Sequence, residues 1–385
     1  MNYSLLPSLD RRPFMPMLRN AISLFSGAGG MDVGFARAGF QTLVACELDK
    51  DACATFNSNL HLVGHKGNRI EPTSVTSLDF AALPKDIDVV FGGPPCQGFS
   101  VAGKMDPSDE RSKLIESFFD VVDATKPRGF VCENVKNLAV SERWAAVRNK
   151  ILSRAKNEYR TALIILNATD FGVPQIRERM FLVGIRKDLF KGTDTSLHNQ
   201  LMRELGAVHK PAPTVAEVVK KLGRAGTANN PQTCTAIISF AKTPVMRKSP
   251  YAGMLFNGAG RPLPASGWAT TLPASMGGNK TPIVDEREIF EGVDSFIAQY
   301  HRELLKGGSV KEGQAPKNLR RLTIKECMAI QTFPKDYKFC GSKSSIYRQI
   351  GNAVPCDLAE AVANAFDKIL SRSQERSYSD AAFVA

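Results

Sequence analysis

The alternation of strand-like and helix-like segments between Ala21 and about Arg186 constrains the fold most strongly. Short runs rich in β-branched and aromatic residues predict strands over Ala21–Phe25, Thr42–Cys46, Ile87–Phe91, Gly129–Cys132, Leu163–Asn167 and Met180–Ile185. Amphipathic stretches predict helices between them, over Met31–Ala38, Asp51–Asn57, Ser112–Ala124 and Glu142–Ala155. Because strands that alternate with helices form sheets covered on both faces, this pattern predicts a doubly wound α/β fold. In such sheets, ligands bind at the carboxyl ends of the strands.

The segment from Leu205 to Lys280 has a different composition. It contains eight prolines, nine glycines and repeated turn sequences, so we expect a loop-rich second domain there. It also contains nine Lys and Arg residues against a single acidic residue, Glu217, in a chain whose net charge is +12. This charge predicts a face for nucleic acid, although a solvated basic surface would have the same composition.

Composition also limits the cellular setting and the kinds of site. No apolar run reaches about 18 residues and no secretory signal is recognisable at the N-terminus, so we expect a soluble protein. The eight cysteines are too sparse for a disulfide scaffold, and no pair has C-x-x-C spacing. These observations favour a reducing cytoplasmic compartment and predict no metal site.

A glycine-rich turn, Phe25-Ser26-Gly27-Ala28-Gly29-Gly30, follows the first predicted strand and opens a helix. Such a turn lets a ligand approach the backbone and the helix N-terminus. It departs from G-x-G-x-x-G, because Asp32 occupies the third glycine position. Glu47 follows the second strand, where an acid can bind ribose hydroxyls. Together these features predict a nucleoside-containing cofactor, while a tight turn with a surface acid is the alternative.

A rigid cysteine follows the third strand, in Phe91-Gly92-Gly93-Pro94-Pro95-Cys96. The glycines clear space and the prolines restrict the backbone, so Cys96 is held at the ligand edge of the sheet. This placement favours a nucleophile over a small buried apolar residue.

A carboxylate and two guanidinium groups are expected at the same edge. Glu133 follows the strand Gly129–Cys132, and Arg177 and Arg179 lie two residues apart just before another strand. Strand alternation would aim both arginines at one face. A surface salt-bridge cluster is the alternative interpretation of these residues.

Six sequence motifs together resemble those of a known enzyme family. The sequences SLFSGAGGMDVGF, GGPPCQGFS, ENV, QIRERMFLVG, RRLTIKECMAIQTFP and YRQIGNAVP resemble, in order, the motifs of the DNA (cytosine-5)-methyltransferases. The resemblance spans roughly 21–186 and 320–372, and ATTLPASMGGNKTPIVD is similar to the family's recognition region. It implies a Rossmann-like S-adenosylmethionine-dependent methyltransferase sheet with a smaller target-recognition domain. The implied organisation is an N-terminal tail over 1–20, a catalytic domain over 21–190 and 345–372, a recognition domain over 191–344 and a C-terminal tail over 373–385.

The resemblance also implies roles for individual residues. Cys96 would be the nucleophile, Glu133 the acid, and Arg177 and Arg179 the pair beside the base. Glu47 would hold the ribose and Asp79 the adenine amine. The implied cofactor pocket comprises Phe25, Ser26, Gly27, Gly29, Gly30, Glu47, Leu48, Asp79, Phe80, Pro94, Leu114, Asn352 and Val354.

The chemistry of cytosine agrees with these residue types. Carbon 5 is a poor nucleophile until a thiolate adds to carbon 6 and places electron density on carbon 5. Ring nitrogen 3 then becomes more basic, which suits the carboxyl group of Glu133. An arginine, Arg179 first, would stabilise negative charge on the 2-keto oxygen. Because the ring face is inaccessible in stacked DNA, the base must be flipped out.

The expected partner is double-stranded DNA, with a separate restriction endonuclease as a further possibility. Basic residues would contact phosphates and a few polar side chains would read base edges. The candidate DNA contacts are Gln97, Ser100, Lys104, Thr270, Thr271 and Asn279. We expect a monomer that acts at the nucleoid and releases S-adenosylhomocysteine.

Three other functions remain to be compared with this one. Methylation of tRNA cytosine uses the same chemistry, but the long basic region favours a duplex reader. A non-catalytic DNA-binding regulator would not need Cys96, Glu133 and Arg179. A nicotinamide oxidoreductase is disfavoured by Asp32 and by the Pro-Pro-Cys loop.

Overall fold

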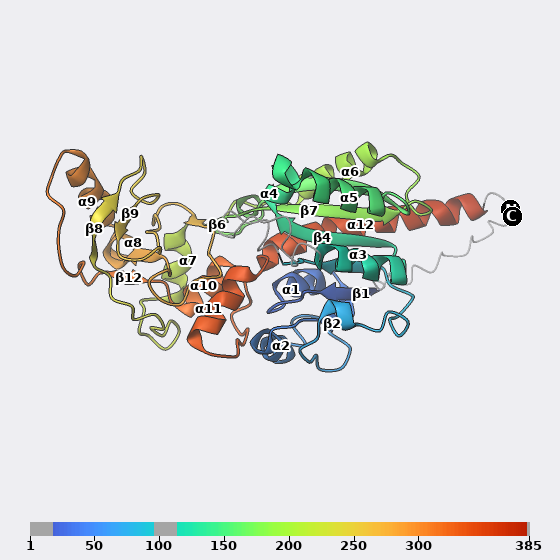
Figure 1. The fold of residues 1–385 in the computed structure, drawn as a ribbon, viewed down its shortest axis with the longest axis horizontal. Coiled ribbons are helices and arrows are strands. Elements are labelled where there is room, and N and C mark those ends of the chain that lie inside the picture. Colours follow the sequence, from blue (N-terminus) through green and yellow to red (C-terminus); the bar gives the residue numbers. More distant parts are fainter. Residues whose placement is uncertain (1–17, 96–113, 383–385) are drawn as a thin grey trace, which may run out of the picture.

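The computed structural model describes residues 18–95 and 114–382, with side chains described through Ser373. Figure 1 shows a larger lobe built around a sheet and a smaller lobe of short strands, helices and loops beside it. Among the described residues, no helix combines the length and apolar character needed to cross a membrane.

The larger lobe contains a sheet with strand order β2-β1-β3-β4-β7-β5. The strands are β1 (Arg19–Leu24), β2 (Phe40–Cys46), β3 (Val89–Gly92), β4 (Gly129–Val135), β5 (Tyr159–Asn167) and β7 (Glu178–Arg186). The pairs β1–β2, β1–β3 and β3–β4 are parallel, whereas β7 runs antiparallel to both β4 and β5. The carboxyl ends of β1 to β4 therefore lie at one edge of the sheet.

Helices cover both faces of this sheet. On one face lie α1 (Gly30–Arg37), α6 (Asp194–Ala207) and α12 (Cys356–Ala382), and on the other lie α3 (Leu114–Thr125) and α5 (Ala145–Ala155). Strand alternation divides the buried side chains between the two layers, because Val89 and Phe91 of β3 join the first core and Val90 joins the second. The predicted doubly wound α/β fold is confirmed.

The elements differ from the sequence predictions mainly at their ends. The sequence pattern predicts a final helix over Asp357–Leu370 followed by a polar tail, whereas the helix continues to Ala382, so its predicted end is wrong. The sequence after Leu370 contains no glycine or proline that would end the helix. The antiparallel direction of β7 and the helix α6, which packs on β5 and α12, were not predicted.

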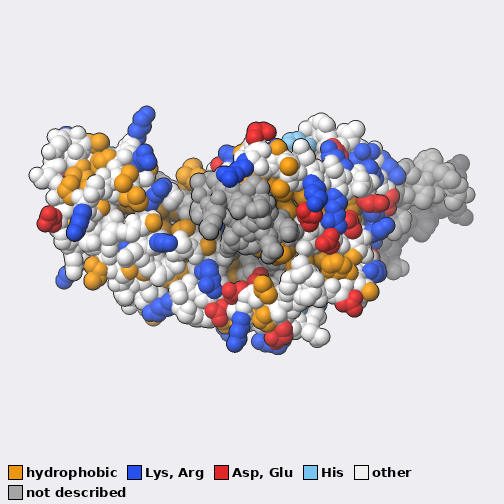
Figure 2. All heavy atoms as spheres, in the orientation of Figure 1, with side chains coloured by type: hydrophobic (Ala, Val, Ile, Leu, Met, Phe, Trp, Pro, Cys, Tyr) orange, Lys and Arg blue, Asp and Glu red, His pale blue; other side chains and the backbone are white. Residues whose placement is uncertain are grey.

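The smaller lobe is rich in loops, as its composition predicts. Its elements are α7 (Val215–Leu222), β8 (Phe240–Val245), β9 (Met254–Phe256), β10 (Ala269–Thr270), β11 (Ile283–Asp285), α8 (Glu286–Glu291), α9 (Phe296–Leu305), β12 (Leu319–Arg321), α10 (Ile324–Ile330) and α11 (Lys343–Asn352). The nine Lys and Arg residues between Leu205 and Lys280 are all exposed. Figure 2 shows basic side chains distributed over this lobe.

Among the described residues, a strand pair and a shared helix core help to join the lobes. The short strand β6 (Gln175–Ile176), which precedes β7, pairs in parallel with β10 of the smaller lobe. The helix α2 (Lys50–Asn57), which follows β2, shares a core with α10 and α11 through Phe56 and Tyr337. Both contacts lie beside the carboxyl edge of the sheet.

Helices α1 and α12 approach closely because α1 contains Gly34. A Cβ atom at Gly34 would lie 2.5 Å from the Cβ of Ala359 and 2.5 Å from the backbone nitrogen of Glu360. We predict that Gly34→Ala lowers the free energy of unfolding by about 1–2 kcal/mol, because overpacking exceeds the gain in helix propensity. Urea denaturation measures this difference.

Gly206→Ala is the matched control, because a Cβ atom at this helical glycine would meet no heavy atom within 4 Å. It should leave stability unchanged or raise it by up to about 1 kcal/mol. Equal stability of the two variants would contradict the close helix contact.

Candidate active site

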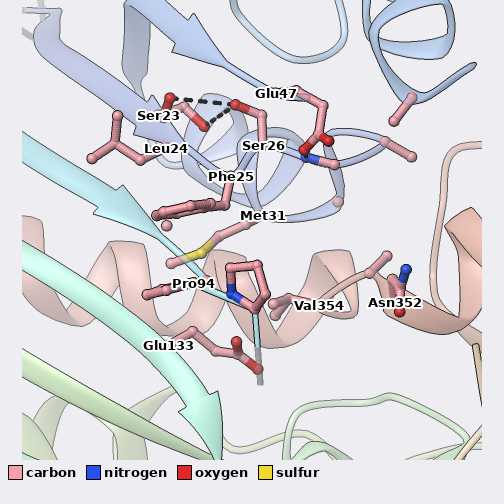
Figure 3. A pocket seen from close by; sticks show the side chains of 18 of the residues that line it. Ser23, Leu24, Phe25, Ser26, Met31, Glu47, Pro94, Glu133, Asn352 and Val354 are labelled. Atoms are coloured by element: carbon pink, nitrogen blue, oxygen red, sulfur yellow. Dashed lines mark hydrogen bonds between the residues drawn. The ribbon is translucent and has the colours of Figure 1, made fainter. Parts of the chain in front are cut away.

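A cavity of about 320 Å³ opens at the carboxyl ends of β1 to β4. Glu47 and Glu133 lie on opposite sides of it, with Phe25, Met31 and Pro94 between them (Figure 3). The predicted site residues that line it are Phe25, Ser26, Gly27, Gly30, Glu47, Leu48, Pro94, Leu114, Glu133, Arg177, Arg179, Asn352 and Val354. The fold thus gathers most of the predicted cofactor pocket in one place with three of the predicted catalytic side chains, those of Glu133, Arg177 and Arg179.

The glycine-rich turn forms one wall of the cavity. Phe25 has φ of 53° and Gly27 has φ of 56°, so the chain reverses sharply after β1. The Gly27 N–H donates to Glu47 Oε2 over 2.7 Å, and Glu47 Oε1 accepts from the backbone N–H groups of Leu48 and Asp49. These bonds hold the carboxylate of Glu47 against the turn.

The turn also packs directly against the loop that follows α11. A Cβ atom at Gly30 would lie 2.6 Å from the carbonyl oxygen of Val354, so only glycine fits at this contact. The hydroxyl of Tyr337 donates to the carbonyl oxygen of Ala28. These contacts bring Asn352 and Val354, which are distant in sequence, to the same cavity.

Glu133 and Arg179 form an ion pair inside the cavity, with 3.0 Å between Arg179 Nε and Glu133 Oε1. The side chain of Arg179 is 14% exposed and that of Glu133 is 11% exposed. Burial raises the pKa of Glu133 above its usual value, although Arg179 and then Arg177 oppose the shift. The site therefore favours a carboxyl group that can carry a proton and remain oriented by a cation.

The chain leading to position 96 lies against this pair. A Cβ atom at Gly93 would be 2.8 Å from Glu133 Oε2, and Asn134 Nδ2 donates to the carbonyl oxygen of Pro94 over 3.1 Å. Glu133 belongs to β4 but extends beyond the last residue pair that β4 makes with β3, Cys132 with Gly92. The segment before Cys96 and the carboxyl group are thus neighbours at the sheet edge.

Arg177 has different surroundings from Arg179. Its guanidinium group is buried and donates to the carbonyl oxygen of Gly351 over 3.2 Å and to that of Leu272 over 3.4 Å. It therefore connects the start of β7 with α11 and with the segment after β10. Both arginines line the cavity, as strand alternation predicts, but Arg179 alone is paired with Glu133.

Some predicted cofactor residues lie outside the cavity lining. Asp79 and Phe80 follow a short 3₁₀ turn at Val75–Ser77, and the exposed Asp79 accepts a hydrogen bond from the Ala81 N–H over 3.0 Å. Gly29 caps α1 behind the turn. Cys96, Gln97, Ser100 and Lys104 lie outside the described residues.

The structure brings two of the predicted recognition residues to the catalytic lobe. Thr270 pairs with Ile176, and the Thr271 hydroxyl donates to the Ile176 carbonyl oxygen over 2.9 Å. Both threonines are thereby next to Arg177. Asn279 is exposed and does not line the cavity.

Asp32 is a further cavity residue, which the sequence motifs did not predict as part of the site. This side chain lines the cavity at 0% exposure, and neither carboxylate oxygen has a hydrogen-bond partner with good geometry among the described residues. Burial raises its pKa to about 7, although the nearby Ser23 hydroxyl and its own backbone lower it. The signal in the sequence was the departure from the G-x-G-x-x-G pattern, where an acid occupies a glycine position.

Comparison with known proteins identifies the family. A family model described as C-5 cytosine-specific DNA methylase matches residues 19–368. This chain belongs to that family. Type II methyltransferase M1.HphI of Haemophilus parahaemolyticus is 31% identical to this chain over 360 residues, and the match covers 90% of this chain and 86% of the relative. Type II methyltransferase M.NgoPII of Neisseria gonorrhoeae is 30% identical over 359 residues, covering 91% and 96%.

Solved structures show the same fold at lower identity. A putative DNA modification methyltransferase encoded within an E. coli prophage has a TM-score of 0.61 and 23% identity, and covers 92% of this chain and 99% of its own. The S. pombe Dnmt2 methyltransferase has a TM-score of 0.60 at 16% identity, with coverage of 92% and 99%. These likenesses confirm the predicted fold class.

The C-5 cytosine-specific DNA methylase is an S-adenosylmethionine-dependent enzyme that methylates cytosine in DNA, as the ordered motifs predict. The family match does not favour the tRNA methyltransferase, the non-catalytic regulator or the oxidoreductase. The roles of individual residues are predictions that the family match leaves open.

The buried carboxyl group of Asp32 should make stability depend on pH. Its folded pKa of about 7 exceeds the unfolded value, so the ligand-free protein loses stability as pH rises from about 4 to 7. We predict that Asp32→Asn removes this dependence. The difference in free energy of unfolding between variant and wild type should shift in favour of the variant by up to about 4 kcal/mol from acid to above neutral pH. Urea denaturation at about pH 4 and about pH 8 measures the change.

Asp51→Asn is the matched control, because Asp51 lies in the first turn of α2 and does not line the cavity. Its pH profile should follow that of the wild type. Parallel profiles for wild type and Asp32→Asn would contradict the buried, unpaired carboxylate.

Substitutions of the two arginines should differ in their effect on the free energy of unfolding. The guanidinium of Arg177 donates hydrogen bonds to the carbonyl oxygens of Leu272 and Gly351, and Arg177→Lys replaces it with a single ammonium group. This variant should lower the free energy of unfolding by about 2 kcal/mol. Arg179→Lys keeps the charge beside Glu133 and should change stability less. The reverse order in urea denaturation would assign the structural role to Arg179.

Proposed function

We propose that this enzyme methylates carbon 5 of cytosine within a specific duplex DNA sequence, through a covalent bond between Cys96 and carbon 6 of a flipped base. The observation that supports this most directly is the buried Glu133–Arg179 pair, which lies against the chain leading into Cys96. An acid, a cation and a cysteine at one sheet edge are the groups that this reaction requires.

The cavity suits S-adenosylmethionine. Glu47 would bind the ribose hydroxyls, because its carboxylate is fixed at the wall by backbone N–H groups. Phe25, Leu48 and Pro94 offer apolar surface, and the unpartnered oxygens of Asp32 suit a ligand that carries positive charge. When bound, the cofactor supplies an electrophilic methyl group on a sulfonium, and S-adenosylhomocysteine is the product.

The remaining cofactor assignments complete this proposal. Ser26, Gly27, Gly30, Asn352 and Val354 line the same cavity, together with Leu114. Asp79 beside the adenine amine, Phe80 near the adenine and Gly29 behind the turn stay predictions from the family resemblance.

The protein side chains would act on the base in sequence. The Cys96 thiolate adds to carbon 6, which moves an electron pair toward carbon 5 and increases the basicity of nitrogen 3. Glu133, whose pKa is raised by burial, holds a proton at nitrogen 3. Arg179 orients Glu133 and stabilises charge on the 2-keto oxygen, while Arg177 positions the strand that carries Arg179. Once carbon 5 carries the transferred methyl group, a base takes the carbon 5 proton, the thiolate departs from carbon 6, and 5-methylcytosine is released.

The smaller lobe would bind duplex DNA through its exposed Lys and Arg residues. Thr270 and Thr271 lie where the lobe meets Arg177, so we place them near the flipped base, with Gln97, Ser100 and Lys104 following the nucleophile. Asn279 would contact DNA farther from the cavity.

The relatives M1.HphI and M.NgoPII are named as Type II methyltransferases, which supports a role in restriction and modification beside a separate endonuclease. We propose a monomer acting at the nucleoid in the cytoplasm.

Methyl transfer from labelled S-adenosylmethionine to duplex DNA tests the proposal, and bisulfite sequencing locates the product. Cys96→Ser should lose more than about 10²-fold in turnover while still binding DNA, and Glu133→Gln should lose about 10²–10⁴-fold.

Cys340→Ser is the matched control, because Cys340 lies outside the cavity and only contacts Ser58 and neighbouring groups. It should retain wild-type turnover. Substantial turnover by Cys96→Ser would refute the nucleophile, and incorporation into tRNA rather than DNA would refute the substrate.

A further inference from the structure

We infer that Asp32 selects the charged cofactor over its neutral product, by placing an unpaired carboxylate opposite the sulfonium of S-adenosylmethionine. The inference rests on the proposed cofactor pocket and adds a specificity-determining residue to it. S-adenosylmethionine and S-adenosylhomocysteine share the ribose, the adenine and the amino-acid end, so a group that distinguishes them must respond to the sulfur.

Asp32 lies in the wall of the cavity, and its carboxylate accepts no hydrogen bond of good geometry from a described residue. It is the third residue of α1, which begins directly after the glycine-rich turn, and it lines the cavity beside Gly30 and Met31. Its side chain has 0% exposure to solvent, and neither oxygen has a hydrogen-bond partner among the residues that the structure describes. An unpaired carboxyl group in a dry place is destabilising unless something compensates for it.

The stabilisation of a helix by an acid in its first turn does not explain this residue. An acid gains that stabilisation at an exposed position, without being buried. The neighbouring groups compensate for the charge only in part, because the Ser23 hydroxyl and the backbone of Asp32 lower its pKa less than burial raises it. Ser23 shares a hydrogen bond with Ser26, and Tyr337, which faces Asp32 from the loop after α10, donates to the carbonyl oxygen of Ala28.

The charged group that acts on Asp32 is another acid. Glu47 faces it from the end of β2 and raises its pKa further, and no basic residue contributes to that pKa. Two carboxyl groups without a cation form a negative region in this part of the cavity, so a ligand with positive charge is favoured there.

The sulfonium fits Asp32 better than the ammonium of the same ligand does. An ammonium group donates hydrogen bonds and is best bound where several acceptors converge. A sulfonium has no N–H or O–H group, so it is stabilised only through space, and that attraction is strongest in a dry environment. An isolated buried carboxylate supplies this attraction.

The same arrangement would favour exchange after each turnover. Methyl transfer converts the sulfonium into a neutral thioether, and Asp32 then again lies unpaired beside Glu47. Because burial holds its pKa at about 7, the carboxyl group can take up a proton when the positive charge disappears and release it when the next cation binds.

Calorimetry on the full chain with each ligand tests this inference. For the wild type, the ratio of the Kd of S-adenosylhomocysteine to that of S-adenosylmethionine should rise about tenfold from about pH 6 to about pH 8, because only ionised Asp32 favours the cation. The positive sulfonium lowers the pKa of the amino group of S-adenosylmethionine relative to that of S-adenosylhomocysteine, so ligand titration is removed by dividing the wild-type ratio by the Asp32→Asn ratio at each pH. For Asp32→Asn, the ratio should keep only the pH dependence of the ligands and be about tenfold lower than the wild-type ratio at the higher pH.

Proton release gives a second readout. At about pH 7, titrations in buffers of different ionisation enthalpy give the difference in protons released between S-adenosylmethionine and S-adenosylhomocysteine, and this difference should be about half a proton larger for the wild type than for Asp32→Asn. An analogue with a primary amine in place of the S-methyl group should behave like S-adenosylmethionine. Asp51→Asn removes the same charge outside the cavity and should match the wild type.

The outcomes separate this inference from the proposed function. Equal weakening of both ligands by Asp32→Asn, or an unchanged ratio, would overturn charge selection while leaving the cofactor pocket in place. Failure of the wild type to bind either ligand would overturn the pocket itself, and the inference with it.

Discussion

Parallel pairing of β1, β2, β3 and β4 is the constraint on which the site depends. Parallel strands end at the same edge, so the chain leaves the sheet four times within a small region. The glycine-rich turn follows β1, Glu47 follows β2, Pro94 follows β3 and Glu133 closes the parallel part of β4. Residues about 20 to 110 positions apart in sequence thereby share one cavity without any long connecting structure.

The antiparallel strand β7 supplies what parallel strands cannot. Because β7 enters the sheet where β4 leaves it, Arg179 at its start pairs in register with Val135 and reaches Glu133. The cavity therefore has opposite electrostatic character at its two ends. Asp32 and Glu47 make the end beside β1 and β2 negative, and Arg177 and Arg179 make the end beside β4 and β7 positive. This division suits a reaction in which a cation donates a methyl group and the base transiently accumulates negative charge.

Arg177 and the strand β6 connect the cavity with the smaller lobe. The guanidinium of Arg177 holds the carbonyl of Leu272 and that of Gly351, and β6 pairs with β10 immediately beside it. Gln175 adds a third link, because its Oε1 accepts from the Leu272 N–H over 2.9 Å. The segment after β10 is thus joined to the start of β7 through buried hydrogen bonds, which resist displacement more than surface contacts do.

The sequence by itself determined the α/β class, the loop-rich basic lobe and the identity of most cavity residues, because strand periodicity, glycine and proline positions and the ordered motifs are local signals. Tertiary structure decided what depends on distant neighbours. Arg177 and Arg179 look equivalent in QIRER, yet one holds carbonyl oxygens and the other holds Glu133. In the sequence, Asp32 looks like an ordinary acid in the first turn of a helix. Its burial and its lack of a well-placed hydrogen-bond partner appear only in the fold. Such roles follow from burial and from the surrounding charges, and these are properties of the assembled fold rather than of any short stretch of sequence.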